Sequence, residues 1–95
     1  MSLPSLREIL ALPAFAGAEV LSGQSRLDEP VTWVHVSEVM DAWRFLSGGE
    51  VLVSTGLELA RATPAARVAY LRSLVEARAQ GLVLALARLS SVSLI

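Results

Sequence analysis

Two short apolar runs on either side of a long helical pattern constrain the fold of this chain most strongly. The runs are Glu50–Ser54 and Leu82–Ala87, and the pattern between them covers residues 64–80. Runs that are apolar on both faces are typical of parallel strands buried between helices. Strand, helix and strand in this order form a βαβ unit, for which we expect a right-handed crossover. The predicted fold class is therefore α/β, with flanking helices and a small, mostly parallel sheet of about three or four strands.

The helix of this unit has clear signals at both ends. Thr63 is typical of an N-cap and Pro64 of the first helical position, while Gly81 is typical of the residue just past a helix. The period of 3.6 residues predicts one broad apolar face. That face comprises Val68, Leu71, Leu74, Val75 and Arg78.

The first half of the chain predicts shorter elements. Residues 5–8 read Ser-Leu-Arg-Glu, which matches a capping box and predicts a helix that ends near Leu12. We expect a brief strand over Ala18–Leu21 and a clear strand over Val31–Val36, which is rich in β-branched and aromatic residues. Residues 41–46 predict one or two helical turns that end at a pair of glycines.

The length of 95 residues predicts a single domain over residues 1–95. Hydrophobic residues make up 54% of the chain even without its six glycines. An average soluble domain reaches only about 45–50% with glycine included. We therefore expect either a partner surface or missing neighbouring segments to cover part of the apolar surface. Since residues 89–95 do not look like a covering helix, we also expect the chain to be truncated at its C-terminal end.

Charge and cysteine content exclude several classes of protein. The formal net charge is −1, and the eight basic residues, all Arg, are scattered singly along the chain, so no basic stripe is present to neutralise the phosphates of DNA or RNA. The absence of cysteine excludes disulfide scaffolds and thiolate sites. No apolar stretch is long enough to span a membrane and no signal peptide is evident, so we expect a cytoplasmic protein without membrane contact.

A candidate binding site follows from where the predicted strands end. Ser37 and Glu38 leave the strand 31–36, and Thr55 and Gly56 leave the strand 50–54. In open α/β sheets, ligands bind beyond the carboxyl ends of the strands. If the two strands are parallel neighbours, these four residues meet at one edge and would suit a small polar molecule with N–H or O–H donors. The alternative is structural: Ser37 caps a turn, and Thr55 and Gly56 only end a strand.

Catalysis and metal binding have little support. His35 is the only histidine, and without cysteines or paired carboxylates it makes a poor metal ligand, so we expect a buried, hydrogen-bonded side chain and no metal site. Glu38 or Asp41 could serve as the base of a small hydrolase, but no motif for a nucleophile accompanies them. We therefore expect no enzymatic activity and no cofactor.

Five short motifs carry a resemblance to a known family. They occur in this order: residues 10–13 (Leu-Ala-Leu-Pro), 17–20 (Gly-Ala-Glu-Val), 27–31 (Leu-Asp-Glu-Pro-Val), 33–38 (Trp-Val-His-Val-Ser-Glu) and 48–56 (Gly-Gly-Glu-Val-Leu-Val-Ser-Thr-Gly). The resemblance that they carry covers residues 6 to about 87. Together they resemble the N-terminal domain of PucR-type (purine catabolism regulatory protein-like) bacterial transcription regulators. The last predicted strand of the sequence, residues 82–87, lies at the end of the region that the resemblance covers.

The resemblance implies a sensory or regulatory module that controls the breakdown of purines or related nitrogen compounds. It implies that DNA is contacted only through a separate helix-turn-helix domain, which this chain lacks. One hypothesis is a domain that responds to a small effector, such as a purine-pathway metabolite, at Ser37, Glu38, Thr55 and Gly56. The alternative is a dimerisation module of the same regulator that binds no ligand and forms a homodimer.

Overall fold

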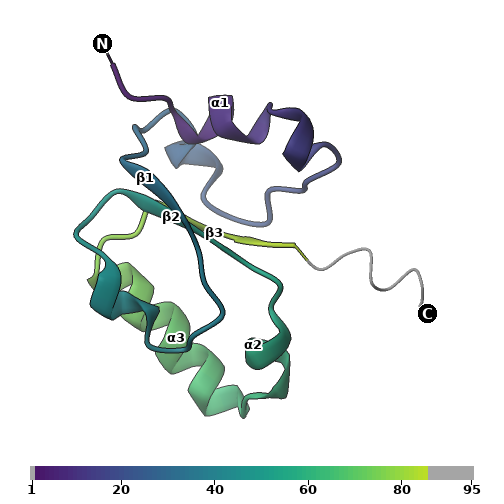
Figure 1. The fold of residues 1–95 in the computed structure, drawn as a ribbon, viewed down its shortest axis with the longest axis vertical. Helices are drawn as coiled ribbons and strands as arrows, with labels where there is room; N and C mark the ends of the chain where they lie inside the picture. The colour runs from purple at the N-terminus through teal and green to yellow at the C-terminus, as the bar shows by residue number, and fades with distance from the viewer. Residues whose placement is uncertain (1, 86–95) are drawn as a thin grey trace.

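A computed structural model describes residues 2–85 of the chain. Its centre is a parallel sheet of three strands in the order β1-β2-β3, in which β1 is Trp33–Val36, β2 is Glu50–Ser54 and β3 is Gly81–Leu84 (Figure 1). The predicted α/β class with a small parallel sheet is confirmed. The middle strand, β2, is buried on both faces, as its apolar residues 51–53 predict. The sheet therefore lies between two layers of the molecule.

The register of the sheet assigns each strand residue to one of two faces. His35 lies beside Leu52 and Leu52 beside Leu82, whereas Val34 lies beside Val51. Since side chains alternate along a strand, Leu52 and Val51 point to opposite faces of the sheet. Helix α1, Leu6–Leu10, covers the face that carries Val51, and helix α3, Pro64–Glu76, covers the face that carries Leu52, as Figure 1 shows.

The first layer is the N-terminal segment. Helix α1, Leu6–Leu10, begins with the predicted capping box: the Glu8 N–H donates to Ser5 Oγ at 3.1 Å, and the Ser5 N–H donates to Glu8 Oε1 at 2.8 Å. Single 3₁₀ turns follow at Pro13–Phe15 and Gln24–Arg26. The buried cluster of this layer consists of Leu6, Ile9, Val31 and Val51.

The second layer holds both connections between strands. The link from β1 to β2 contains a 3₁₀ turn at Ala42–Phe45, where one or two helical turns were expected. The link from β2 to β3 contains α2, Leu57–Arg61, and α3, Pro64–Glu76. Their buried cluster consists of Ala42, Leu52, Tyr70 and Leu74. In the order β1-β2-β3, two parallel crossovers of the same handedness must lie on the same face of the sheet, and both connections do. That this handedness is right-handed stays a prediction.

Two expectations about elements need correction, and one helix was not expected at all. Residues 18–21 form no strand; Leu21 is 83% exposed and the run has no pairing partner in the described sheet. The sequence also gave no sign of α2. On α3 the buried side chains are Tyr70 and Leu74 rather than the whole predicted face, since Val68, Leu71 and Val75 are exposed. The helix is apolar on several sides, so its period alone could not select the side that meets the sheet.

Helix α3 also ends earlier than residue 80. Arg78 takes a φ of 61°, which is the left-handed conformation that usually belongs to glycine. The Ala79 N–H then donates to the Leu74 carbonyl at 3.0 Å, and the Arg78 N–H donates to the Val75 carbonyl at 3.0 Å. These are the two bonds of a Schellman motif, so Arg78 ends the helix and Gly81 is free to begin β3. The predicted strand residues 86–87 and the tail 89–95 lie outside the described residues.

Candidate functional site

The ends of β1 and β2 meet at one edge of the sheet. The two strands are parallel neighbours, and the Ser37 N–H donates to the Val53 carbonyl at 3.1 Å just past β1. The structure therefore brings Ser37, Glu38, Thr55 and Gly56 together, as the strand-end argument predicts. Ligand binding by these residues stays a prediction.

Glu38 is the centre of this group. Its Oε2 accepts from the Thr55 N–H at 2.8 Å, and its Oε1 accepts from the Thr55 hydroxyl at 2.9 Å and from Ser54 Oγ at 3.1 Å. Ser54 is buried, and its oxygen in turn accepts from the Gly56 N–H at 2.9 Å. Glu38 thus fastens the chain leaving β1 to the chain leaving β2. Ser54 belongs to the site although no role was predicted for it; its position as the last residue of β2 was the available signal.

The local turn roles that formed the structural alternative are present as well. Ser37 Oγ accepts from the Val39 N–H at 3.3 Å, which closes a short turn. Gly56 has a φ of 78° and is the residue from which α2 begins. With these contacts in place, Glu38 remains an exposed residue. An ionised carboxylate offers about four lone-pair sites, so it can accept from a ligand in addition to its three internal donors.

Hydrogen bonds set the charge of this carboxylate. Hydrogen bonds from the Thr55 N–H and the Thr55 hydroxyl hold the pKa of Glu38 below its ordinary value. Burial opposes them with a smaller effect, and the hydrogen bond from Ser54 lowers the pKa least. Burial raises the pKa of the nearby Tyr70 phenol, and the Glu38 charge raises it further. Glu38 is therefore ionised at neutral pH and makes a weak base, while Tyr70 remains protonated.

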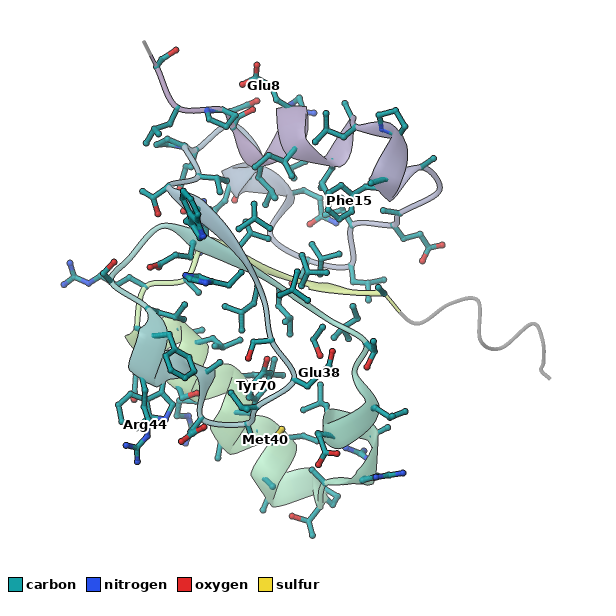
Figure 2. All side chains as sticks on the ribbon, viewed as in Figure 1. Glu8, Phe15, Glu38, Met40, Arg44 and Tyr70 are labelled. Carbon is teal, nitrogen blue, oxygen red and sulfur yellow. The ribbon has the colours of Figure 1, made fainter. Side chains whose placement is uncertain are left out.

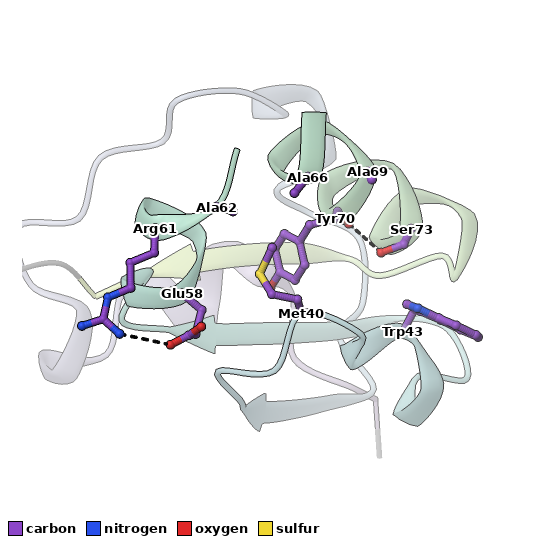
Figure 3. A pocket seen from close by; sticks show the side chains of 9 residues that line it. All are labelled: Met40, Trp43, Glu58, Arg61, Ala62, Ala66, Ala69, Tyr70 and Ser73. Atoms are coloured by element: carbon purple, nitrogen blue, oxygen red, sulfur yellow. Dashed lines mark hydrogen bonds and ion pairs between the residues drawn. The ribbon is translucent and has the colours of Figure 1, made fainter. Parts of the chain in front are cut away.

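A hollow between α2, α3 and the segment after β1 lies near this edge. It has a volume of about 430 Å³, within the usual range of about 300–1,000 Å³ for ligand sites. Tyr70 and Met40 lie against each other in it, and Glu58 and Arg61 form an ion pair at 3.7 Å on its rim (Figure 3). Figure 2 shows Glu38 next to Tyr70 on the α3 side of the sheet. Sequence reasoning missed this hollow because it depends on the small alanines of α3 and on α2.

A second carboxylate serves the opposite end of β2. Glu50 is only 3% exposed, and its oxygens accept from the Ser47 N–H at 2.7 Å, the Gly48 N–H at 2.8 Å and Ser47 Oγ at 3.1 Å. Burial raises the pKa of Glu50, but the hydrogen bonds from Ser47 and Gly48 outweigh it and leave the pKa below its ordinary value. Glu50 closes the turn before β2 and has no exposed face for a ligand.

The remaining candidates do not join the site. The His35 side chain is half-buried and has no hydrogen bond within residues 2–85, so the expectation of a buried, hydrogen-bonded histidine is wrong. Asp41 is paired with Arg44 at 2.9 Å. Across the described part of the chain, three or more metal-ligating side chains do not gather anywhere. Nor does any helix in that part have the length and apolar character needed to cross a membrane.

By its fold and its strand-end cluster, the chain falls into the class of small parallel α/β domains, whose polar residues gather where the strands end. It belongs to the purine catabolism regulatory protein-like family, whose model matches residues 8–94. Searches of curated proteins and of solved structures found no match. Family membership places the chain among regulator-type proteins of purine catabolism and confirms the resemblance drawn from the five motifs.

Proposed function

We propose that this chain is a sensory domain of a transcription regulator, and that a small metabolite of purine or related nitrogen-compound breakdown binds at the strand-end cluster. The observation that carries the proposal is the exposed, ionised Glu38 carboxylate, fixed by Ser54 and Thr55 where β1 and β2 end. Molecules of this class carry several N–H donors, which such a carboxylate accepts. The hollow beside Tyr70 offers space for the rest of the molecule.

The proposal assigns no catalytic step to the chain. The lowered pKa of Glu38 favours acceptance of a hydrogen bond over removal of a proton at neutral pH. DNA contact would belong to a separate helix-turn-helix domain, since the net charge of −1 gives this domain little attraction for phosphates.

Titration calorimetry of the purified chain with purines, ureides and their breakdown products tests the proposal. We expect at least one of them to bind, and Glu38→Gln to weaken its binding by about tenfold or more, since a charged acceptor is replaced by a neutral amide that donates on one side. Thr55→Ser keeps the hydroxyl and should retain affinity. Glu76→Gln, an exposed change at the end of α3, is the matched control.

Two results would contradict the proposal. One is a panel in which nothing binds to the folded chain. The other is a ligand that binds the Glu38→Gln variant as tightly as the original, with circular dichroism showing that both are folded.

Dimerisation is the second candidate function, and one observation favours it. Large apolar side chains remain exposed on two separate elements, among them Val36 at 79% on β1 and Val75 at 74% on α3. Such side chains are typical of surfaces that a partner covers. A dimer and an effector site are compatible in one regulatory domain.

A further inference from the structure

Among the residues that the structure describes, strand β1 has one edge without a neighbouring strand. In the order β1-β2-β3, it is hydrogen-bonded to β2 on one side only. The N-terminal segment runs beside the residues that precede it: the Val31 N–H donates to the Pro4 carbonyl at 2.8 Å, and Ser5 forms an antiparallel bridge with Pro30. Within residues 2–85 this cover ends at Val31, and no other strand lies along the outer side of β1.

The backbone groups on the open side belong to Val34 and Val36. Successive residues of a strand direct their N–H and C=O groups to alternate sides. The Ser37 N–H donates to the Val53 carbonyl of β2. By alternation, the backbone N–H and C=O groups of residues 33 and 35 also point toward β2, and those of residues 34 and 36 point away from it. Unpaired groups of this kind are a template for another strand.

This edge lacks the features that usually prevent pairing. Soluble proteins protect edge strands with lysine or other charges, with proline or with a covering segment. Trp33–Val36 contains no lysine, acidic residue or proline, and Trp33 is 65% exposed. A hollow of about 310 Å³ lies beside the strand and is lined by Val36 and by Phe45, which is itself 62% exposed. The edge therefore combines free backbone groups with uncovered apolar side chains.

We propose that β1 pairs antiparallel with β1 of a second copy of this chain around a two-fold axis. A strand edge is self-complementary under such an axis, so one surface serves both copies. With His35 facing His35 of the second copy, Val34 lies opposite Val36 and their outward N–H and C=O groups exchange hydrogen bonds. Strand β1 contains no carboxylate and no arginine, so two paired copies of the strand bring no such like charges together.

The available area predicts a weak dimer. An aromatic side chain buries about 150–250 Å². The exposed parts of Trp33, Phe45, Val34 and Val36 therefore offer roughly 450 Å² per copy, or about 900 Å² in total, which is below the standard interface of about 1,200–2,000 Å². We expect reversible self-association in the micromolar range or weaker, in the absence of any ligand.

Sedimentation equilibrium of the purified chain from about 5 to 500 μM tests the pairing. Val36→Lys places a charge on the edge and should weaken self-association by about tenfold or more. Val75→Lys is the matched control, because it changes the same residue type at similar exposure on α3 and should leave self-association unchanged. Val36→Pro removes an outward N–H while keeping the ladder to β2 and should also weaken it.

Several outcomes would overturn the proposal. A chain that stays monomeric at 500 μM has no self-pairing edge. A dimer that Val75→Lys dissociates and Val36→Lys does not would place the interface on the exposed side of α3, and a dimer that resists all three variants would lie elsewhere. Urea unfolding of each variant separates lost pairing from lost folding. Since no effector is present, failure here leaves the effector proposal to its own calorimetric test.

Discussion

At the scale of single residues, the two carboxylates at the ends of β2 have similar hydrogen bonds but differ in exposure to solvent. Glu50 and Glu38 each accept three hydrogen bonds from the protein, but only Glu38 is exposed. The position of Glu38 was predictable because it follows a clear strand, whose end lies at a sheet edge. The role of Glu50 was not, because its donors, Ser47 and Gly48, come from a turn whose shape the sequence does not specify.

Gly49 gives a prediction at this scale. Its φ is 83°, and a Cβ placed there would lie 2.8 Å from Thr32 Cγ2. Gly49→Ala should therefore cost about 1 kcal/mol for the left-handed backbone and roughly 1–3 kcal/mol more for the clash. Gly23, with a φ of 84° and open space around it, is the matched control and should show only the first cost. Urea unfolding measures both, and equal losses would contradict the role given to Thr32.

At the scale of elements, strands were easier to predict than helix faces. Continuous apolar runs identified β2 and β3. Strand β2 is buried between two layers and has no polar side, whereas β3, at the edge of the sheet, is half-buried and ends at the exposed Leu84. For α3, the sequence located the N-terminus at Thr63, whose hydroxyl accepts from the Ala66 N–H at 3.1 Å. It could not locate the buried face or the C-terminus, which depend on the register of β2 and on an arginine in a glycine-type conformation.

Two leucines of α3 that the sequence places on one face differ in burial, and they test which part of the helix packs against the sheet. Leu74 is 5% exposed and packs in the cluster with Leu52, whereas Leu71 is 46% exposed. Leu74→Ala should lower the free energy of unfolding by about 2–5 kcal/mol, as for other buried leucines. Leu71→Ala should change it by less than about 1 kcal/mol. Similar losses at both positions would mean that α3 packs through the face expected from its sequence.

At the scale of the whole molecule, hydrogen-bonded carboxylates join the layers and set the response to acid. A hydrogen bond from Arg7 lowers the pKa of Asp28, which ties α1 to the segment before β1. A hydrogen bond from Gln80 lowers the pKa of Glu29, between the N-terminal layer and the start of β3. The pKa values of Glu38 and Glu50 are lowered at the two ends of β2.

These shifts predict the direction of the pH dependence. A carboxyl group whose pKa is lower in the folded state stabilises that state above its ordinary pKa, here 3.8 for Asp and 4.5 for Glu. That contribution is lost as the pH falls through the folded-state values. The free energy of unfolding in urea should therefore be constant from about pH 7 to 5.5 and fall steadily from there to pH 3. Glu50→Gln should flatten part of this decline, and a stability that rises toward pH 3 would contradict the assignment.

The residues that directly follow strand β1 belong to the polar cluster, and the outer side of β1 makes the proposed contact with a second copy. Ligand binding and association of the two copies are then thermodynamically linked. If an effector changes the association constant by some factor, association changes the affinity for the effector by the same factor. Measuring assembly with and without ligand would therefore also give the cooperativity of ligand uptake. The signal sent to a DNA-binding partner would then be carried by a change in subunit stoichiometry.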